Sequence, residues 1–374
     1  MKRLFIITGE YSGDIHASNV VRELKALNCD LEIEGIGGMN LEKEGVKLFA
    51  NQEKMSAVGL SPQIIINHYK LGKALVEYLK NTFKPDLVLL IDYGAFNLTI
   101  AGFLHKAGIK VFYYIPPQVW ASRKYRINLI KKFVDKVLCI FPFEKPLYAQ
   151  YGIDTHYCGH PLVAQLPAPV GKREFLREHG FDIERPLVSV FPGSREFELK
   201  HLMPVFKDAV NRLRHRHPEL QFCFSHAPNL SDEVYNKYFQ DMDVKVIKGE
   251  NQALLSASDA LILASGTVAL EACLYKTPMI IAYKGPQLFY WIYLLVRCIK
   301  RVSLPNIIAD KTIVPELIQK NANTINITFE IERLLYDKKE REKNIKELGE
   351  VKALLSSKNS ALEVAKVIDM ELFP

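Results

Sequence analysis

The chain has 374 residues, of which 48% are hydrophobic and 24% are charged. This is the composition of an ordinary soluble globular enzyme, and it excludes disordered and fibrous proteins. A chain of this length can bury sizeable cores, and we expect two domains rather than one. The formal net charge of +7 suits acidic partners such as phosphates, nucleic acid or an anionic membrane surface, although a basic surface without a role explains it too.

Six cysteines lie mostly in apolar segments, and no two are spaced as a C-x-x-C pair: Cys29, Cys139, Cys158, Cys223, Cys273 and Cys298. We therefore expect reduced core thiols in a cytoplasmic protein. The N-terminus shows no secretory signal pattern, and no apolar run approaches the roughly 20 residues of a membrane-spanning helix.

Short β-branched or aromatic runs alternate with longer amphipathic runs, which predicts βα units and mostly parallel sheets. The first expected strands are Leu4–Thr8, Leu87–Ile91, Val111–Ile115 and Val137–Phe141. After a Pro-rich passage, Pro161–Pro169, the pattern begins again at Leu187–Phe191, Gln221–Ser225, Val244–Ile247, Ala260–Leu263 and Met279–Tyr283. We interpret the passage as an interdomain linker.

The predicted fold is α/β, with two Rossmann-like, doubly wound domains that face a cleft. The expected domains cover residues 1–165 and 170–330. A polar tail, 331–374, is expected to be helical and to dock on a domain of its own chain or of a partner. Ligands of such folds bind at the carboxyl ends of the strands, where four informative loops fall.

The first loop follows the strand at Leu4–Thr8 and carries Glu10, Ser12 and Asp14. Its glycines are not spaced as G-x-G-x-x-G, and no Lys-Ser or Lys-Thr pair follows as in a P-loop. Acids and hydroxyls are poor phosphate ligands, but they suit sugar hydroxyls and amides. We therefore expect this loop to hold a polyol or an amide rather than an anion.

The second loop begins with Asp92, directly after the strand at Leu87–Ile91. A carboxylate just past a buried strand end is a candidate general base. The alternative is an Asx-turn that starts the next helix.

The third loop contains Gly193, Ser194 and Arg195 at an expected helix start. A guanidinium at a helix N-terminus is electrostatically misplaced without an anion, because both are positive. This loop is therefore a candidate site for phosphate.

In the fourth loop, Ser265, Gly266 and Thr267 offer backbone amides, hydroxyls and a positive helix end to a diphosphate. Glu271, about one turn later, is placed to accept hydrogen bonds from a ribose diol. The alternative is a capped helix with Glu271 in its favoured first turns. Two phosphate-suited helix ends in one domain predict a nucleotide diphosphate.

An ordered series of motifs from about residue 7 to residue 310 resembles the lipid-A-disaccharide synthase family. Its members here are Gly9–Asp14, Gly35–Met39, Ile91–Asp92 with Phe96–Asn97, Pro117–Ala121, Pro142–Glu144, Gly159–Pro161, Pro192–Arg195, Ala264–Thr267 with Leu270–Glu271, and Ser303–Asn306. A single motif of this kind is weak evidence, whereas the series in order is highly specific.

The resemblance implies an inverting GT-B glycosyltransferase that joins UDP-2,3-diacylglucosamine to 2,3-diacylglucosamine 1-phosphate, or lipid X. The products would be the β-1,6-linked disaccharide 1-phosphate and UDP, with UDP bound to the C-terminal half. Asp92 matches the family's catalytic acid, Arg195 its diphosphate-side arginine, Ser265–Glu271 its nucleotide loop, and Asn306 the asparagine of its Ser-Leu-Pro-Asn motif. Glu10 joins Asp92 and Asn306 as a candidate catalytic residue.

Three positions depart from the family pattern. Gly94 and Ala95 stand where the family usually has a Pro and a second Asp, so any role of that acid is absent here. Ser122 replaces a common aromatic residue, and Ser61-Pro62-Gln63 lacks a usual Glu. Contacts from that last loop are therefore not transferred.

Inversion requires one displacement through an oxocarbenium-like state, with a base on the acceptor 6-hydroxyl and neutralisation of the departing UDP. Asp92 would be the base, and Arg195 with the Ser265–Thr267 helix end would stabilise the diphosphate. The sequence has no Asp-x-Asp run at a strand end and no His/Cys/Asp cluster at ligand spacing, so we expect neither a metal nor a cofactor.

Two rival functions remain open. A UDP-sugar epimerase or hydrolase of the same architecture would share the nucleotide loop, but it would act without an acceptor. A nucleic-acid-binding module would need clustered cations interleaved with aromatics, and the nearest approach, Trp120–Arg126, is short and better explained as part of the cleft. We expect no nucleic-acid partner.

The apolar run Leu288–Val296 is followed by Arg297, Lys300 and Arg301. It is too short to cross a bilayer and suits the headgroup boundary, although an ordinary buried helix is the alternative. The segment Ile64–Lys73 has the same character. We expect a cytoplasmic protein peripherally associated with the inner membrane, with a homodimer through the C-terminal helix as a further possibility.

Overall fold

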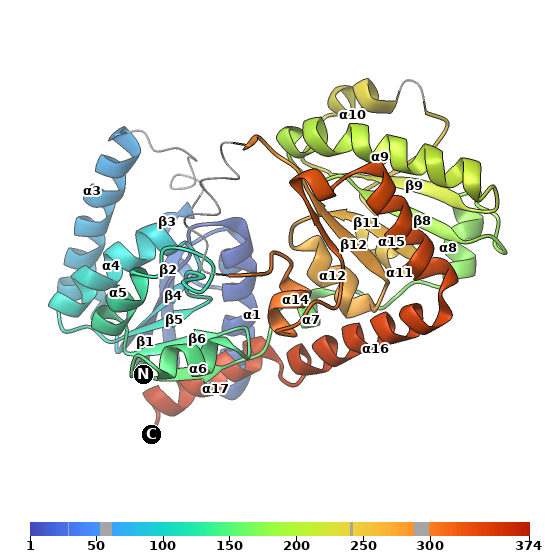
Figure 1. Cartoon of the computed structure of the whole chain (residues 1–374). Coiled ribbons are helices and arrows are strands. Elements are labelled where there is room, and N and C mark those ends of the chain that lie inside the picture. The colour runs from blue at the N-terminus through green and yellow to red at the C-terminus, as the bar shows by residue number, and fades with distance from the viewer. Residues whose placement is uncertain (29, 53–61, 240–241, 288–298) are drawn as a thin grey trace. The chain divides into compact units, whose positions relative to one another are not determined.

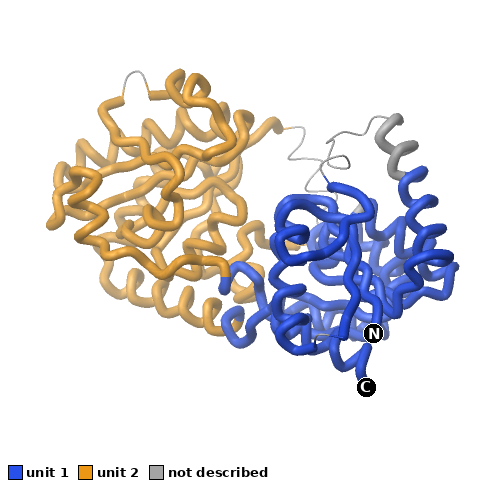
Figure 2. Tube along the Cα trace, turned by 180° about the vertical axis from the view of Figure 1, so that it is seen from behind, with its two compact units in different colours: residues 1–164, 355–374 blue, residues 165–354 orange. Residues whose placement is uncertain are grey.

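The computed structural model describes residues 1–28, 30–52, 62–239, 242–287 and 299–374 (Figure 1). The chain forms two compact units (Figure 2). Unit 1 comprises residues 1–164 and 355–374, and unit 2 comprises residues 165–354. The expected tail, 331–374, is therefore divided between the units, because the last helix belongs to unit 1.

Unit 1 is built on a parallel seven-stranded sheet in the order β3-β2-β1-β4-β5-β6-β7. Its strands are β1 (Lys2–Ile7), β2 (Leu31–Gly37), β3 (Lys47–Asn51), β4 (Leu87–Ile91), β5 (Val111–Tyr114), β6 (Lys136–Cys139) and β7 (Thr155–Tyr157). Leu4 of β1 lies opposite Leu87 of β4, and the strand order reverses at this pair. Such a reversal is the usual ligand-binding edge of a doubly wound sheet.

The helices of unit 1 follow the strands and end with the last helix of the chain. They are α1 (Tyr11–Leu27), α2 (Met39–Lys43), α3 (Pro62–Tyr78) with the π-helical turn η2 (Leu79–Phe83), α4 (Gly94–Lys106), α5 (Arg126–Phe133), α6 (Glu144–Ala149), α7 (Leu162–Gln165, at the unit boundary) and α17 (Ser360–Leu372). The final helix α17 packs on α1, and the Tyr114 and Ser360 hydroxyls are hydrogen-bonded at 2.7 Å. The chain thus returns to unit 1 at its end.

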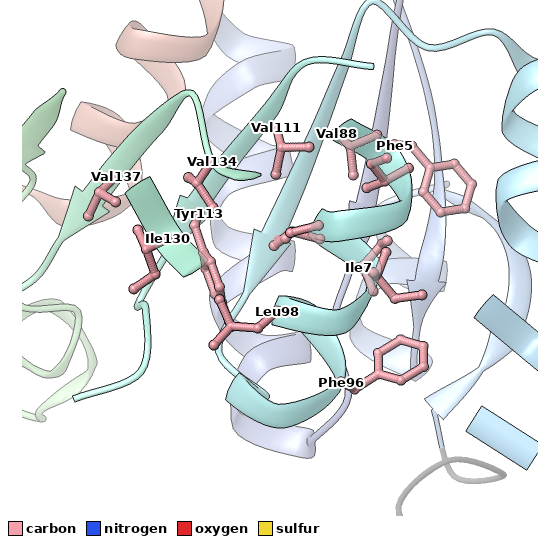
Figure 3. Packing of buried hydrophobic residues seen from close by; sticks show 14 of the residues in the cluster. Phe5, Ile7, Val88, Phe96, Leu98, Val111, Tyr113, Ile130, Val134 and Val137 are labelled. Atoms are coloured by element: carbon pink, nitrogen blue, oxygen red, sulfur yellow. The ribbon is translucent and has the colours of Figure 1, made fainter. Parts of the chain in front are cut away.

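The unit 1 core lies between its sheet and the helices α3, α4 and α5. All five residues of β4, Leu87–Ile91, are buried, as expected for a parallel strand covered on both faces. Figure 3 shows Val88, Val111 and Tyr113 of the sheet beside Leu98 of α4 and Ile130 of α5. This packing fixes the carboxyl ends of β4 and β5, from which the candidate acid loops emerge.

Unit 2 repeats the plan with a parallel six-stranded sheet in the order β10-β9-β8-β11-β12-β13. Its strands are β8 (Leu187–Phe191), β9 (Gln221–His226), β10 (Lys245–Lys248), β11 (Ala260–Ala264), β12 (Met279–Tyr283) and β13 (Glu316–Ile318). Its helices are α8 (Lys172–Glu178), α9 (Glu196–Arg216), α10 (Asp232–Phe239), α11 (Asn251–Ala257), α12 (Val268–Tyr275), α14 (Leu304–Ile308), η3 (Gln319–Asn321), α15 (Thr324–Tyr336) and α16 (Lys338–Leu355). Here the strand order reverses between β8 and β11.

The expected α/β class with two doubly wound sheets is confirmed. All nine expected strands are present, with bounds that differ by at most two residues at either end. The sheets also contain β2, β3, β7 and β13, which the sequence patterns did not single out. Within the described part of the chain, no helix has both the length and the apolarity needed to cross a membrane.

Candidate active site

In unit 1, backbone strain gathers at the carboxyl ends of β4 and β5. Asp92, Tyr93 and Ile115 adopt φ angles of 50°, 48° and 55°. Residues with a Cβ rarely occupy this left-handed region, and a β-branched residue such as Ile115 does so at particular cost. Strain of this kind persists only where the surroundings hold it, and it is concentrated at functional sites.

Neighbouring side chains hold the Asp92 turn from two elements. The fully buried Asn97 of α4 donates its side-chain amide to the carbonyls of Ile91 and Asp92, at 3.1 and 2.8 Å. The Tyr113 hydroxyl of β5 donates to the same Asp92 carbonyl at 2.8 Å. These bonds occupy the main chain at Asp92, so the position of its carboxylate is set by both α4 and β5.

The structure brings Asp92 and Glu10 together at the reversal point of the sheet. Burial raises the pKa of the Asp92 carboxyl, the nearby Glu10 charge raises it further, and a hydrogen bond from the Tyr93 amide opposes both. A Cβ added at Gly9 would lie 2.2 Å from Cδ1 of Tyr93, so the first loop passes directly against the second. A carboxyl with this environment is a candidate for proton transfer.

The other two residues of the first loop differ from each other. Ser12 is exposed in the first turn of α1. Asp14 is fully buried, and its carboxylate accepts from the amides of Gly38 (2.7 Å), Asn40 (2.9 Å) and Leu41 (3.3 Å). The Asp14 side chain therefore caps the start of α2 and ties the first loop to the end of β2.

Two other motifs of unit 1 interlock. Glu144 is buried, and its carboxylate accepts from the indole Nε1 of Trp120 at 3.0 Å and from the amides of Ile140 and Phe141. Burial raises the pKa of Glu144 to about 7, against the effect of these donors. The Trp120 and Phe143 rings meet edge to face at 5.2 Å. The carboxylate thus anchors an aromatic cluster on the loop after β5.

Unit 2 contains a cavity of about 410 Å³ at the carboxyl ends of β8 and β11. This volume is within the usual range of small-molecule sites, about 300–1,000 Å³. All the expected donor-side residues line it: Gly193, Ser194, Arg195, Ser265, Gly266, Thr267 and Glu271. Asn251 also lines it, and its buried Oδ1 has no hydrogen-bond partner among the described residues. The cavity thus offers both charged and polar groups to a ligand.

The turn after β8 is organised by Glu198, which the sequence patterns did not single out. Its carboxylate accepts from the amides of Ser194 (2.9 Å) and Arg195 (3.3 Å). Gly193 has a φ of 112°, and a Cβ there would lie 2.3 Å from the Glu198 carboxylate. The amides are occupied, so this turn offers an anion the 79% exposed Arg195 side chain, whose Nη1 lies 3.3 Å from a carboxylate oxygen of Glu198. A Glu three residues after a helix N-cap is the sequence signal for this arrangement.

The turn after β11 has its amides open. Gly266 and Thr267 are exposed, and their amides have no acceptor among the residues that the structure describes. A Cβ added at Gly266 would meet nothing within 4 Å, so the approach to this helix start is clear. Burial raises the pKa of Glu271, and a bond from the Gln252 side chain, at 3.3 Å, opposes the rise.

Asn306 lies elsewhere in unit 2 and is not among the residues that line the cavity. It is fully buried, donates to Val314 O (2.9 Å) and to Glu316 (2.8 Å), and accepts from the amides of Ile313 (2.7 Å) and Val314 (2.9 Å). The Asn306 amide is therefore fully engaged in joining α14 to the segment before β13.

The apolar run Leu288–Val296 lies outside the described residues, as does Ser61 of the departing loop. Ile64–Lys73 forms part of α3, in which Tyr69 is 54% exposed. Arg301 forms an ion pair with Asp310 at 2.7 Å.

Comparison with known proteins identifies the family. Residues 4–368 match the family described as Lipid-A-disaccharide synthetase. Lipid-A-disaccharide synthase 1 of Legionella pneumophila is 36% identical over 376 residues, covering 99% of this chain and 97% of its own. Lipid-A-disaccharide synthase of Anaeromyxobacter dehalogenans is 36% identical over 375 residues, covering 98% and 96%.

Solved structures agree on the fold at low sequence identity. The UDP-GlcNAc 2-epimerase from Neisseria meningitidis, bound to UDP-GlcNAc, has a TM-score of 0.66 at 14% identity, covering 98% of this chain and 99% of its own. A glycosyltransferase of kitacinnamycin has a TM-score of 0.64 at 11% identity, covering 99% of each. These likenesses confirm the GT-B fold, and the family match over nearly the whole chain shows that it belongs to the lipid-A-disaccharide synthetase family.

Proposed function

We propose that this glycosyltransferase transfers a 2,3-diacylglucosaminyl group from UDP to the 6-hydroxyl of lipid X, with inversion at the anomeric carbon. The observation that carries the proposal is the Asp92 carboxyl on its strained turn, with a pKa raised by burial and by Glu10. A base with a raised pKa takes a hydroxyl proton more readily than an ordinary carboxylate does.

The proposed donor site is the unit 2 cavity. Arg195 would pair with the diphosphate, and the open amides of Gly266 and Thr267 would donate to it. Ser194 and Ser265 would add hydroxyl groups, and Glu271 would accept from the ribose diol. The turn at Gly193 positions Arg195, because the Glu198 carboxylate accepts hydrogen bonds from the amides of Ser194 and Arg195.

In the proposed reaction the acceptor O6 attacks the anomeric carbon while its proton passes to the Asp92 carboxylate. The bond from the anomeric carbon to the diphosphate breaks, and its electron pair leaves with UDP. Arg195 and the amides at the start of α12 would neutralise the developing charge. Glu10 would raise the basicity of Asp92 and, with Ser12, contact sugar hydroxyls.

Asp14 and Asn306 fit a positioning role better than direct contact with substrate. All the acceptors and donors of the Asn306 amide are used within unit 2, and the Asp14 carboxylate accepts three backbone amides. Substitution of either would first disturb the loop that it holds.

Both proposed substrates carry acyl chains, so we place the enzyme at the cytoplasmic face of the inner membrane. The supporting features are the apolar, basic-flanked segments Leu288–Val296 and Ile64–Lys73. A homodimer that exchanges its last helix is a further proposal. In this single chain α17 packs on α1 of its own unit.

The test is incubation of the protein with UDP-2,3-diacylglucosamine, with and without lipid X, followed by mass spectrometry. We expect the disaccharide 1-phosphate and UDP only when both are present. Consumption of the UDP-sugar at the same rate without lipid X would instead indicate an epimerase or a hydrolase.

A further inference from the structure

Two of the four arginines of unit 1 have no acidic partner among the residues that the structure describes. Arg3 pairs with Glu32 at 3.1 Å, and Arg22 pairs with Glu44. Arg123 and Arg126 form no ion pair with any described residue, and neither does Lys124 between them. Unit 1 therefore gathers its uncompensated guanidinium groups in one place, the loop after β5 and the first residue of α5.

Arg126 lies against the turn that carries the proposed base. A Cβ added at Gly94, two residues after Asp92, would be 3.5 Å from Nη1 of Arg126 and 2.7 Å from Cγ of Pro117. The absence of a side chain at Gly94 thus lets the loop after β5 and the Arg126 guanidinium approach the start of α4.

The charge of Arg126 also acts on Tyr113, whose hydroxyl is hydrogen-bonded to the Asp92 carbonyl. Burial raises the pKa of the Tyr113 hydroxyl well above its ordinary value, and the positive charge of Arg126 acts in the opposite direction. The same hydroxyl donates to the Asp92 carbonyl at 2.8 Å. Arg126 is therefore close to Tyr113 and Gly94, and both of these residues adjoin the Asp92 turn.

A partly buried guanidinium without a counter-ion is costly unless a ligand supplies the negative charge. The planar donor fork of arginine matches the oxygens of a phosphate group. The acidic pair Glu10 and Asp92 by itself would repel an anionic substrate, so a nearby cation is needed if the acceptor carries a phosphate.

We propose that Arg126, assisted by the exposed Arg123, binds the phosphate of the acceptor while Asp92 takes the proton from its hydroxyl. This inference rests on the proposed function and assigns the two ends of the acceptor to two groups of unit 1. The phosphate contact selects the sugar phosphate as acceptor and orients its free hydroxyl toward the base.

The test compares lipid X with the same diacylglucosamine without its phosphate, in detergent micelles. Binding of each lipid is measured by calorimetry for the wild type, Arg126→Gln and Arg126→Ala, and KM and kcat are measured with lipid X. We expect both variants to bind lipid X roughly 10- to 100-fold more weakly, as for loss of a charge-assisted hydrogen bond. Their affinity for the phosphate-free lipid and for UDP should equal that of the wild type.

Lys131→Ala is the matched control, since Lys131 is an exposed cation on the same helix with no ion pair among the described residues. It should leave both lipid affinities unchanged. Arg123→Ala, at an exposed loop position, should weaken lipid X binding by a smaller factor than the Arg126 variants do. This variant also tests the proposal if the Arg126 variants fold poorly.

Different results would overturn the proposed function and the assignment of Arg126 to the acceptor phosphate. Wild-type protein that forms no disaccharide from the two lipids would overturn the proposed function. Wild-type protein that forms it, with Arg126 and Arg123 variants that bind lipid X normally or lose both lipids equally, would overturn only the phosphate assignment.

Discussion

The two sheets place loops at equivalent positions but equip them with opposite chemistry. In unit 1 the order reverses between β1 and β4, whose loops carry Glu10 and Asp92. In unit 2 it reverses between β8 and β11, whose loops carry Arg195 and the open amides of Gly266 and Thr267. One reversal point carries two carboxyl groups, and the other carries a guanidinium and open amides beside the carboxyl groups of Glu198 and Glu271.

The two reversal points also differ in strain. Asp92 follows β4 with a φ of 50°, whereas Thr267 begins α12 with an ordinary helical φ of −62°. A strained turn fixes one carboxylate for chemistry, and a relaxed helix start offers several weak donors for binding. The comparison therefore predicts that changes at the Asp92 turn act mainly on kcat, whereas changes in the two unit 2 loops act on both binding and rate.

The largest expected effect is that of Asp92→Asn. Loss of a general base typically lowers turnover by about 10²- to 10⁴-fold, and we expect that range for kcat in steady-state assays. UDP affinity by calorimetry should stay at the wild-type value, because the donor groups are in unit 2. Turnover close to wild type would remove Asp92 from the mechanism.

Arg195→Ala should affect binding and rate together. The guanidinium pairs with the diphosphate in the ground state and in the transition state, and loss of such a bond costs roughly 10- to 100-fold in UDP affinity. Calorimetry with UDP measures this loss. Arg177→Ala, an exposed arginine in the same unit, is the control, and equal affinities for the two variants would contradict the assignment.

Glu198→Ala tests whether Glu198 caps α9 by accepting hydrogen bonds from the amides in the turn after β8. The substitution frees the Ser194 and Arg195 amides and removes a helix cap, which costs about 1 kcal/mol. For a unit of this size, Tm should fall by about 2–4 °C in a thermal melt. The exposed Glu178→Ala serves as control, and an equal shift for both would show that the cap contributes nothing specific.

The smallest expected effect is a shift in pH dependence for Glu10→Gln. The base must be ionised, so kcat is complete above the raised pKa of Asp92 and is lost as the pH falls through it. Removal of the Glu10 charge removes one cause of the rise, so the acid limb of the kcat profile should move to lower pH. An unmoved limb would mean that Glu10 does not act on the group that limits turnover.

Most of the strands could be predicted from local patterns, but some could not. The strands β4, β8 and β12 have the bounds expected from their apolar runs, because both faces of each are covered. By contrast, β2 carries Glu34, which is buried and depends on Lys47 of β3 (2.7 Å) and the Tyr78 hydroxyl (2.5 Å). In the sequence, a charged residue such as Glu34 argues against a buried strand, because its partners on distant segments are not known.

The sequence by itself determined which loops hold polar side chains, since strand ends and helix starts follow from local patterns of apolar and turn-forming residues. Only the tertiary structure decided which of those polar groups are available. Asp14 is occupied by amides 24 to 27 positions away, whereas Arg126 has no acidic partner among the described residues. Hydrogen bonds and ion pairs join segments that are close only after folding, so no local pattern reveals whether a given carboxylate or guanidinium is already satisfied.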